Sequence, residues 1–137
     1  QRTKQKAQDL GLGERVLFLG EVPFARLPDV YAAADVKAIS SDFESFCFAA
    51  VEAMATGLPV VTTDCGWVPT LIGKEGGLVV PLRDAEALAR ALAGLAGDEG
   101  ACRRMGEANR RKAVAEHGWE ASAARLLSVY QRLTAAT

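Results

Sequence analysis

The sequence lacks the features of several common protein classes. Its three cysteines, Cys47, Cys65 and Cys102, are odd in number and widely spaced, and the chain has a single histidine. These residues therefore suit neither a disulfide framework nor a zinc site, and the cytoplasm is the expected location. No apolar run approaches the roughly 18 residues that a membrane-spanning helix requires.

An excess of basic charge is also missing. The chain has 16 Lys and Arg against 17 Asp and Glu, a formal net charge of −1. The two basic runs, at residues 2–6 and 103–112, fall in helix-like segments, where such charges usually form a solvated face. Neither run carries an aromatic or RNA-binding motif, so nucleic acid is not expected as a partner.

Apolar residues make up half of the 137-residue chain, which is enough for one compact domain with one core. The chain opens at Gln1 within a helix-like pattern, with no initiator methionine and no helix N-cap before it. We therefore expect residues 1–137 to form a single partial domain of a longer protein.

Four short apolar runs alternate with helical patterns, as is typical of βαβ units and a mostly parallel sheet. The expected strands are residues 15–20, 35–40, 59–63 and 77–81. Helices are expected at residues 1–10, 27–34, 46–56, 68–72, 85–95, 99–116 and 120–133, with Asp84 and Asp98 as N-caps. The pattern predicts an α/β fold with a Rossmann-like parallel sheet of about four strands flanked by helices.

The last predicted helix is amphipathic, with Ala124, Leu127, Tyr130 and Leu133 near one stripe. Trp119 is expected to be a packing residue beneath this helix.

Ligands of such sheets bind beyond the carboxyl ends of the strands, which directs attention to residues 20–22, 40–47 and 63–67. In the middle segment, a polar loop leads into the helix expected to begin near Phe46, whose free N–H groups and positive dipole end suit phosphate. Glu44 lies just before this helix and Glu52 about two turns into it. Carboxylates beside a phosphate fit a ligand that also carries hydroxyl groups, as a nucleotide sugar does. By spacing alone, Glu44 could equally be a helix-start carboxylate and Glu52 a surface residue.

The block from Glu44 to Val61, Glu-Ser-Phe-Cys-Phe-Ala-Ala-Val-Glu-Ala-Met-Ala-x-Gly-x-Pro-Val-Val, resembles the Glu-x7-Glu block of family 4 glycosyltransferases. These enzymes have the GT-B fold. The resemblance extends over essentially the whole chain, including residues 15–23, 27–36, 77–84 and the Trp119-Glu120 pair. It implies the C-terminal, nucleotide-sugar-binding domain of a retaining glycosyltransferase, truncated at its N-terminus.

The resemblance also implies roles for individual residues. Glu52 would bind the ribose hydroxyls. Glu44 would contact the donor sugar, a positioning role that replaces an older proposal of a nucleophile, and it is the candidate catalytic residue. The backbone at Phe46 to Phe48 would hold the diphosphate, and Gly20 to Val22 would lie beside the base. The expected donor-binding set is Glu44, Ser45, Phe46, Cys47, Phe48, Glu52, Gly20 and Val22.

Such enzymes transfer a sugar with retention of configuration and usually need no metal ion, and this sequence has no Asp-x-Asp motif. No cofactor is expected, and the substrate would be a UDP-, GDP- or ADP-sugar. The family's acceptor-binding N-terminal domain, and its phosphate-binding Arg and Lys, would precede Gln1. The expected partner is therefore the rest of the parent protein, and the isolated chain should show no useful turnover.

Without the strands that would precede Gln1, the sheet would have an exposed edge, which favours a homodimer through that edge. A parent protein that binds peripherally to a membrane remains a further option.

The sequence departs from the family pattern close to the expected ligand. Cys47 and Trp67 replace glycines, Thr70 replaces a glutamate, and Lys37 interrupts an expected strand. The Cys47 side chain could crowd the phosphate, or its thiol could become acidic at the helix terminus. The alternative function is thus a catalytically inert fragment or interaction module that keeps the fold.

Overall fold

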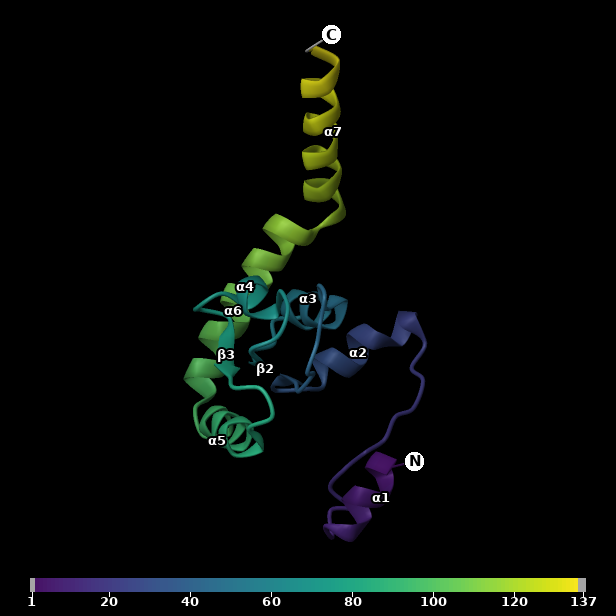
Figure 1. The fold of residues 1–137 in the computed structure, drawn as a ribbon, viewed down its shortest axis with the longest axis vertical. Helices are drawn as coiled ribbons and strands as arrows, with labels where there is room; N and C mark the ends of the chain where they lie inside the picture. Colours follow the sequence, from purple (N-terminus) through teal and green to yellow (C-terminus); the bar gives the residue numbers. More distant parts are fainter. Residues whose placement is uncertain (1, 136–137) are drawn as a thin grey trace.

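The computed structural model describes residues 2–135 and has a parallel three-stranded sheet at its centre. The strands lie in the order β1 (Lys37–Ile39), β2 (Val60–Thr63) and β3 (Gly77–Val80). The helices are α1 (Arg2–Asp9), α2 (Leu27–Ala32), α3 (Phe48–Ala55), α4 (Val68–Ile72), α5 (Ala85–Ala96), α6 (Glu99–His117) and α7 (Trp119–Ala135), with a short 3-10 helix at Phe24–Arg26 (Figure 1).

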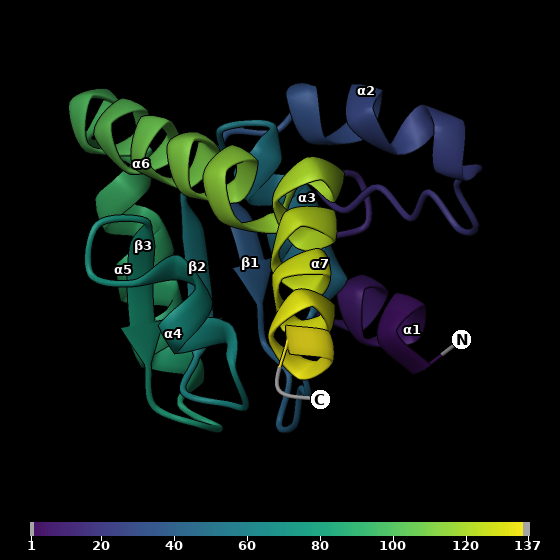
Figure 2. The ribbon, with the colours of Figure 1, turned by 90° about the horizontal axis from the view of Figure 1, so that it is seen from above.

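Helices cover both faces of the sheet, so its central strand is buried throughout (Figure 2). Val60 packs with Met54 of α3 and with Val68 and Leu71 of α4 on one face. On the other face, Val61 packs with side chains of β3, α5 and α6, namely Val80, Leu95 and Ala101. Helices α3 and α4 each connect two neighbouring parallel strands, as such strands require. The predicted α/β fold class is confirmed.

The starts of α5 and α6 follow directly from the sequence. Asp84 accepts a hydrogen bond from the Ala87 N–H, and Asp98 accepts one from the Ala101 N–H, each at 2.8 Å. Each carboxylate satisfies a backbone donor that the first turn of a helix leaves unpaired. The prediction of these two N-caps is confirmed.

The strand predicted at residues 15–20 is wrong. This segment lies on the extended stretch between α1 and the 3-10 helix, away from the sheet (Figure 1). Leu17 and Leu19 are 82% and 51% exposed, and the described sheet contains no strand that pairs with this segment. Apolar character alone does not make a strand, because each strand needs a neighbour to complete its backbone hydrogen bonds.

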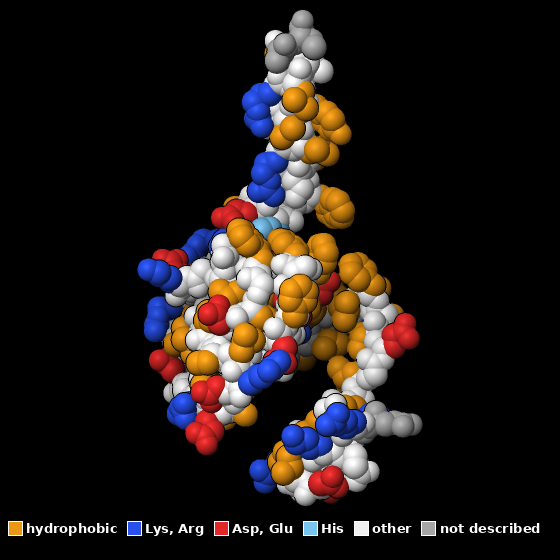
Figure 3. Space-filling model, in the orientation of Figure 1, with side chains coloured by type: hydrophobic (Ala, Val, Ile, Leu, Met, Phe, Trp, Pro, Cys, Tyr) orange, Lys and Arg blue, Asp and Glu red, His pale blue; other side chains and the backbone are white. Residues whose placement is uncertain are grey.

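The predicted packing of Trp119 beneath the last helix is also wrong. Helix α7 projects from the body of the domain, and none of its described residues is buried (Figures 1 and 3). Trp119, expected beneath the helix, is 90% exposed. Leu127, Tyr130 and Leu133 of the predicted stripe are all more than half exposed. No helix within residues 2–135 is both long and apolar enough to cross a membrane.

Helix α3 is held against α6 by a close backbone approach in addition to side-chain packing. A Cβ atom at Gly106 of α6 would lie 1.9 Å from the carbonyl oxygen of Gly57, just after α3. Nearby, the buried Asn109 donates its two amide hydrogens to the carbonyls of Leu58 and Gly76, at 2.7 and 2.6 Å. These carbonyls precede β2 and β3, so α6 crosses the end of the sheet at which the strands begin (Figure 2).

We predict that Gly106→Ala lowers the free energy of unfolding by about 1–3 kcal/mol, because its methyl group must force α6 away from Gly57. The matched control is Gly94→Ala in α5, where a Cβ would meet nothing within 4 Å. There, alanine should raise stability by about 0.5–1 kcal/mol through its better helix propensity. Urea unfolding of both variants checks this, and an equal effect of the two substitutions would disprove the close contact.

Candidate functional site

The loop after β1, residues 40–47, is held by the end of β2 and by the loops that follow β2 and β3. The Thr63 hydroxyl donates to the Ser41 carbonyl at 2.6 Å, and a Cβ at Gly66 would lie 1.7 Å from the Glu44 carbonyl oxygen. Arg83 forms an ion pair with Asp42 at 3.1 Å, although both side chains are largely exposed. The backbone around Glu44 is therefore fixed by packing at the carboxyl end of the sheet, where ligands of parallel sheets bind.

Glu44 is half-buried and its side chain is oriented from within the same loop. The Ser41 hydroxyl donates to Glu44 Oε1 at 2.8 Å. A carboxylate accepts several hydrogen bonds, so this contact leaves Glu44 able to accept others from a ligand hydroxyl.

Helix α3 begins at Phe48, two residues later than predicted. Cys47 is its N-cap and has a left-handed backbone with φ 66°, which residues other than glycine rarely adopt. The Ala50 N–H donates to the Cys47 carbonyl at 2.9 Å, whereas the Phe48 and Ala49 N–H groups have no backbone acceptor within residues 2–135. The first turn of α3 therefore leaves the Phe48 and Ala49 N–H groups without a backbone partner.

The predicted option of an acidic Cys47 thiol is wrong. Burial raises the pKa of Cys47, and the nearby Glu44 carboxylate raises it further. The Ala50 N–H and the Lys37 ammonium lower it, but burial is the largest influence. The thiol therefore stays protonated at neutral pH and behaves as a small apolar group against the core.

Glu52 points from α3 towards α2. The Tyr31 hydroxyl donates to Glu52 Oε2 at 2.9 Å, and both residues line a cavity of about 200 Å³ beside Phe24, Leu27 and Pro28. Burial, the hydrogen bond to Glu52 and the charge of Glu52 together raise the pKa of Tyr31 to about 12. The Lys37 ammonium lies 5.4 Å from the Tyr31 ring centroid, a cation–π contact that accounts for a lysine within β1.

The other predicted site residues are only partly brought together. Phe46 is half-buried, and its ring packs edge-on against the rings of Phe48 and His117, at 5.3 and 5.9 Å between centroids. Ser45 is exposed next to Glu44. Gly20 and Val22 lie on the extended stretch before the 3-10 helix, and no hydrogen bond within residues 2–135 joins them to residues 44–52.

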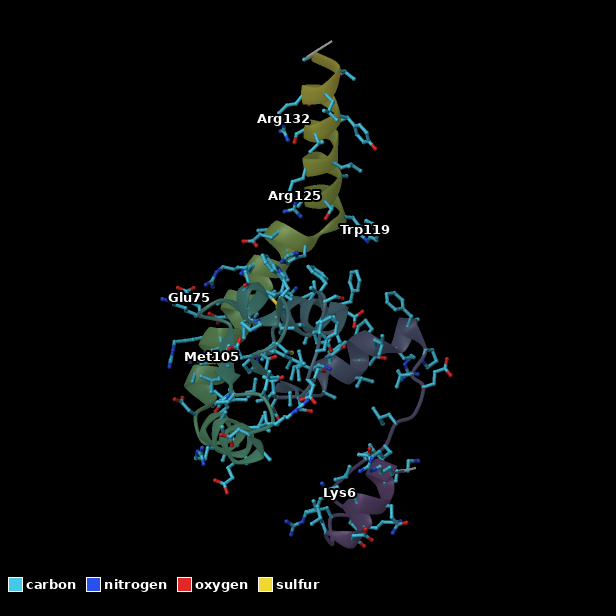
Figure 4. The ribbon with its side chains drawn as sticks, viewed as in Figure 1. Lys6, Glu75, Met105, Trp119, Arg125 and Arg132 are labelled. Atoms are coloured by element: carbon cyan, nitrogen blue, oxygen red, sulfur yellow. The ribbon has the colours of Figure 1, made fainter. Side chains whose placement is uncertain are left out.

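A larger groove lies at the opposite end of the sheet. It measures about 430 Å³ between the start of β3 and α6, near Glu75 and Met105, which Figure 4 labels. Its lining alternates in charge, with Lys74, Arg104 and Arg111 beside Glu75 and Glu107. This groove contains none of the residues predicted for the site, and it lies away from the carboxyl ends of the strands. No three His, Cys, Asp or Glu side chains of the described chain lie close enough together to hold a metal ion.

Sequence reasoning missed Tyr31 as part of the site, whereas Thr63 and Gly66 lie in the segment 63–67 to which it directed attention. Tyr31 lies 21 positions before Glu52, and no periodic pattern connects the two residues. The close contact at Gly66 could be expected from the residue type, because a glycine after a strand often marks a position where two backbone segments approach closely.

Comparison with known proteins assigns the family. The family model "Glycosyl transferases group 1" matches residues 1–112. This chain belongs to the group 1 glycosyl transferases. It has the parallel α/β fold of the C-terminal half of GT-B enzymes, and its relatives are named glycosyltransferases.

The similarity to individual group 1 glycosyl transferases covers nearly all of this chain but only part of theirs. A D-inositol 3-phosphate glycosyltransferase of Corynebacterium glutamicum is 39% identical over 93% of this chain and 30% of its own length. The solved sucrose-phosphate synthase of Thermosynechococcus elongatus aligns with a TM-score of 0.91 at 36% identity, over 99% of this chain and 34% of that one. HepE of Anabaena, solved with UDP, aligns with a TM-score of 0.77 at 29% identity, over 82% of this chain and 31% of that one. The chain thus spans about a third of the length of these relatives.

Proposed function

We propose that this chain is the donor-binding part of a retaining glycosyltransferase and binds a nucleoside diphosphate sugar at the start of α3. The observation that carries the proposal is that α3 begins at Phe48, with Glu44 in the loop before it and Glu52 one turn into the helix, each already oriented by a hydroxyl group. Membership of the group 1 glycosyl transferases supports a sugar donor. The UDP in the HepE structure supports a nucleotide as part of that donor.

Each part of the donor has a suitable group in this arrangement. The free N–H groups and the positive dipole end of α3 would hold the diphosphate. Glu52 would accept hydrogen bonds from the ribose hydroxyls, and Glu44 would accept them from the sugar. Since each carboxylate already accepts one hydroxyl of the protein, both are oriented before the donor binds.

The proposal extends to the reaction of the parent protein. Transfer would occur with retention and without a metal ion, in the cytoplasm, with the acceptor bound by the remainder of the parent protein. The absence of an Asp-x-Asp motif from residues 1–137 supports metal independence. Cationic groups that stabilise the departing diphosphate would also come from the remainder, so this chain alone should bind the donor without turning it over.

Calorimetric titration of the purified chain with UDP, GDP and ADP tests the proposal. We expect saturable binding of one nucleotide, weakened about tenfold to a hundredfold by Glu52→Ala, because a hydrogen bond to a charged group contributes about 1.5–3 kcal/mol. The control is Glu107→Ala, which removes an exposed carboxylate from α6 and should leave binding unchanged. Failure of all three nucleotides to bind at millimolar concentration would support the alternative of an inert fragment that keeps the fold.

A second prediction concerns Cys47. Its left-handed backbone costs an L-residue about 1–2 kcal/mol, and it directly precedes the N–H groups proposed to hold the diphosphate. We expect Cys47→Gly to tighten nucleotide binding severalfold in the same titration. Cys47→Ala, which removes the sulfur but keeps the Cβ, should bind less tightly than Cys47→Gly. Equal affinity of the two variants would show that the Cβ does not obstruct the ligand.

A further inference from the structure

Tyr31 is connected to the proposed ribose ligand, Glu52, by the hydrogen bond that joins α2 to α3. The hydroxyl donates to Glu52 Oε2 at 2.9 Å in a half-buried setting. The ring is itself held in place, since the Lys37 ammonium lies over it and the ring lines the cavity beside α2. Neither of these contacts needs the hydroxyl group, so its function can be separated from that of the ring.

The hydrogen bond from Tyr31 uses one of the two carboxylate oxygens of Glu52 and leaves the other for a ligand. Tyr31 occupies Oε2, and no group within residues 2–135 donates to Oε1. A flexible glutamate loses rotamer freedom when it binds, and a fixed partner removes part of that cost in advance. Oε1 is therefore held in one direction, available to accept a hydroxyl hydrogen.

The tyrosine stays a donor over the whole physiological range. Burial and the adjacent carboxylate raise the pKa of Tyr31 to about 12, so its hydroxyl keeps its proton at neutral pH. A carboxylate held by such a donor favours a ligand that supplies a second hydroxyl donor. Ribose does so through its vicinal diol, whereas 2′-deoxyribose has lost one of those hydroxyls.

We propose that Tyr31 is a positioning residue that orients Glu52 and thereby sets a preference of the donor site for a ribonucleotide over its 2′-deoxy counterpart. This inference rests on the proposed function, since Glu52 must bind the ribose. Tyr31 itself touches the carboxylate rather than the substrate.

The test is to measure the dissociation constants of the tightest-binding ribonucleoside diphosphate and of its 2′-deoxy form, for the unmodified chain and for Tyr31→Phe. We expect the unmodified chain to prefer the ribonucleotide roughly tenfold, the effect of losing one hydrogen bond to a charged group. Tyr31→Phe should weaken deoxynucleotide binding less than ribonucleotide binding, because the deoxy form has one hydroxyl fewer for Glu52 to accept from, so the ratio of the two constants falls. A merely structural loss would weaken both ligands equally and keep the ratio, which would overturn the inference.

Two further variants separate this inference from the proposed function. Tyr130→Phe removes the hydroxyl of the chain's other tyrosine, on α7, and should leave the ratio unchanged. In a Glu52→Gln background the ratio should be low, and adding Tyr31→Phe should not lower it further, because Tyr31 acts through the carboxylate.

If Glu52→Gln keeps the full preference, or the unmodified chain binds no nucleotide, the proposed function fails and the inference fails with it. If Glu52→Gln abolishes the preference and Tyr31→Phe keeps it, only the role of Tyr31 fails.

Discussion

The contact of α6 with the turn after α3 is the constraint on which the rest of the domain depends. Gly106 lets the two backbones meet at Gly57, and Asn109 ties α6 to the segments that precede β2 and β3. Well-packed protein interiors deform little, so contacts of this kind hold neighbouring elements in fixed relative positions. Fixing α3 at its end in this way determines where its other end, at Phe48, lies relative to the carboxyl edge of the sheet.

The site at that edge combines a fixed backbone with carboxylates that are oriented in advance. Packing of Gly66 against Glu44 fixes the loop, while Ser41 and Tyr31 each donate a hydroxyl to one of the two glutamates. Such preorganisation lowers the entropy lost when a ligand binds. The departure from this design is Cys47, whose left-handed backbone keeps the conformation that a glycine would adopt while adding a side chain.

Much of the fold was predictable because its signals are local. The caps Asp84 and Asp98 and three of the four expected strands follow from patterns within a few residues. Residues 15–20 and α7 carry the same kind of pattern, but their placement depends on which surfaces meet them, and a local pattern contains no such information. For the same reason, the Glu-x7-Glu spacing pointed to the region of the site but not to Tyr31, which reaches Glu52 only through the packing of α2 on α3.

The most direct test of a donor site at the start of α3 is an amide NMR spectrum of the isotope-labelled chain, recorded during titration with UDP, GDP and ADP. We predict that the largest shift changes occur at Phe48, Ala49 and Glu52, at the start of α3 and along the helix face towards α2. Changes concentrated instead around Lys74, Arg104 and Arg111 would contradict it, because the diphosphate would then bind the basic groups at the opposite end of the sheet.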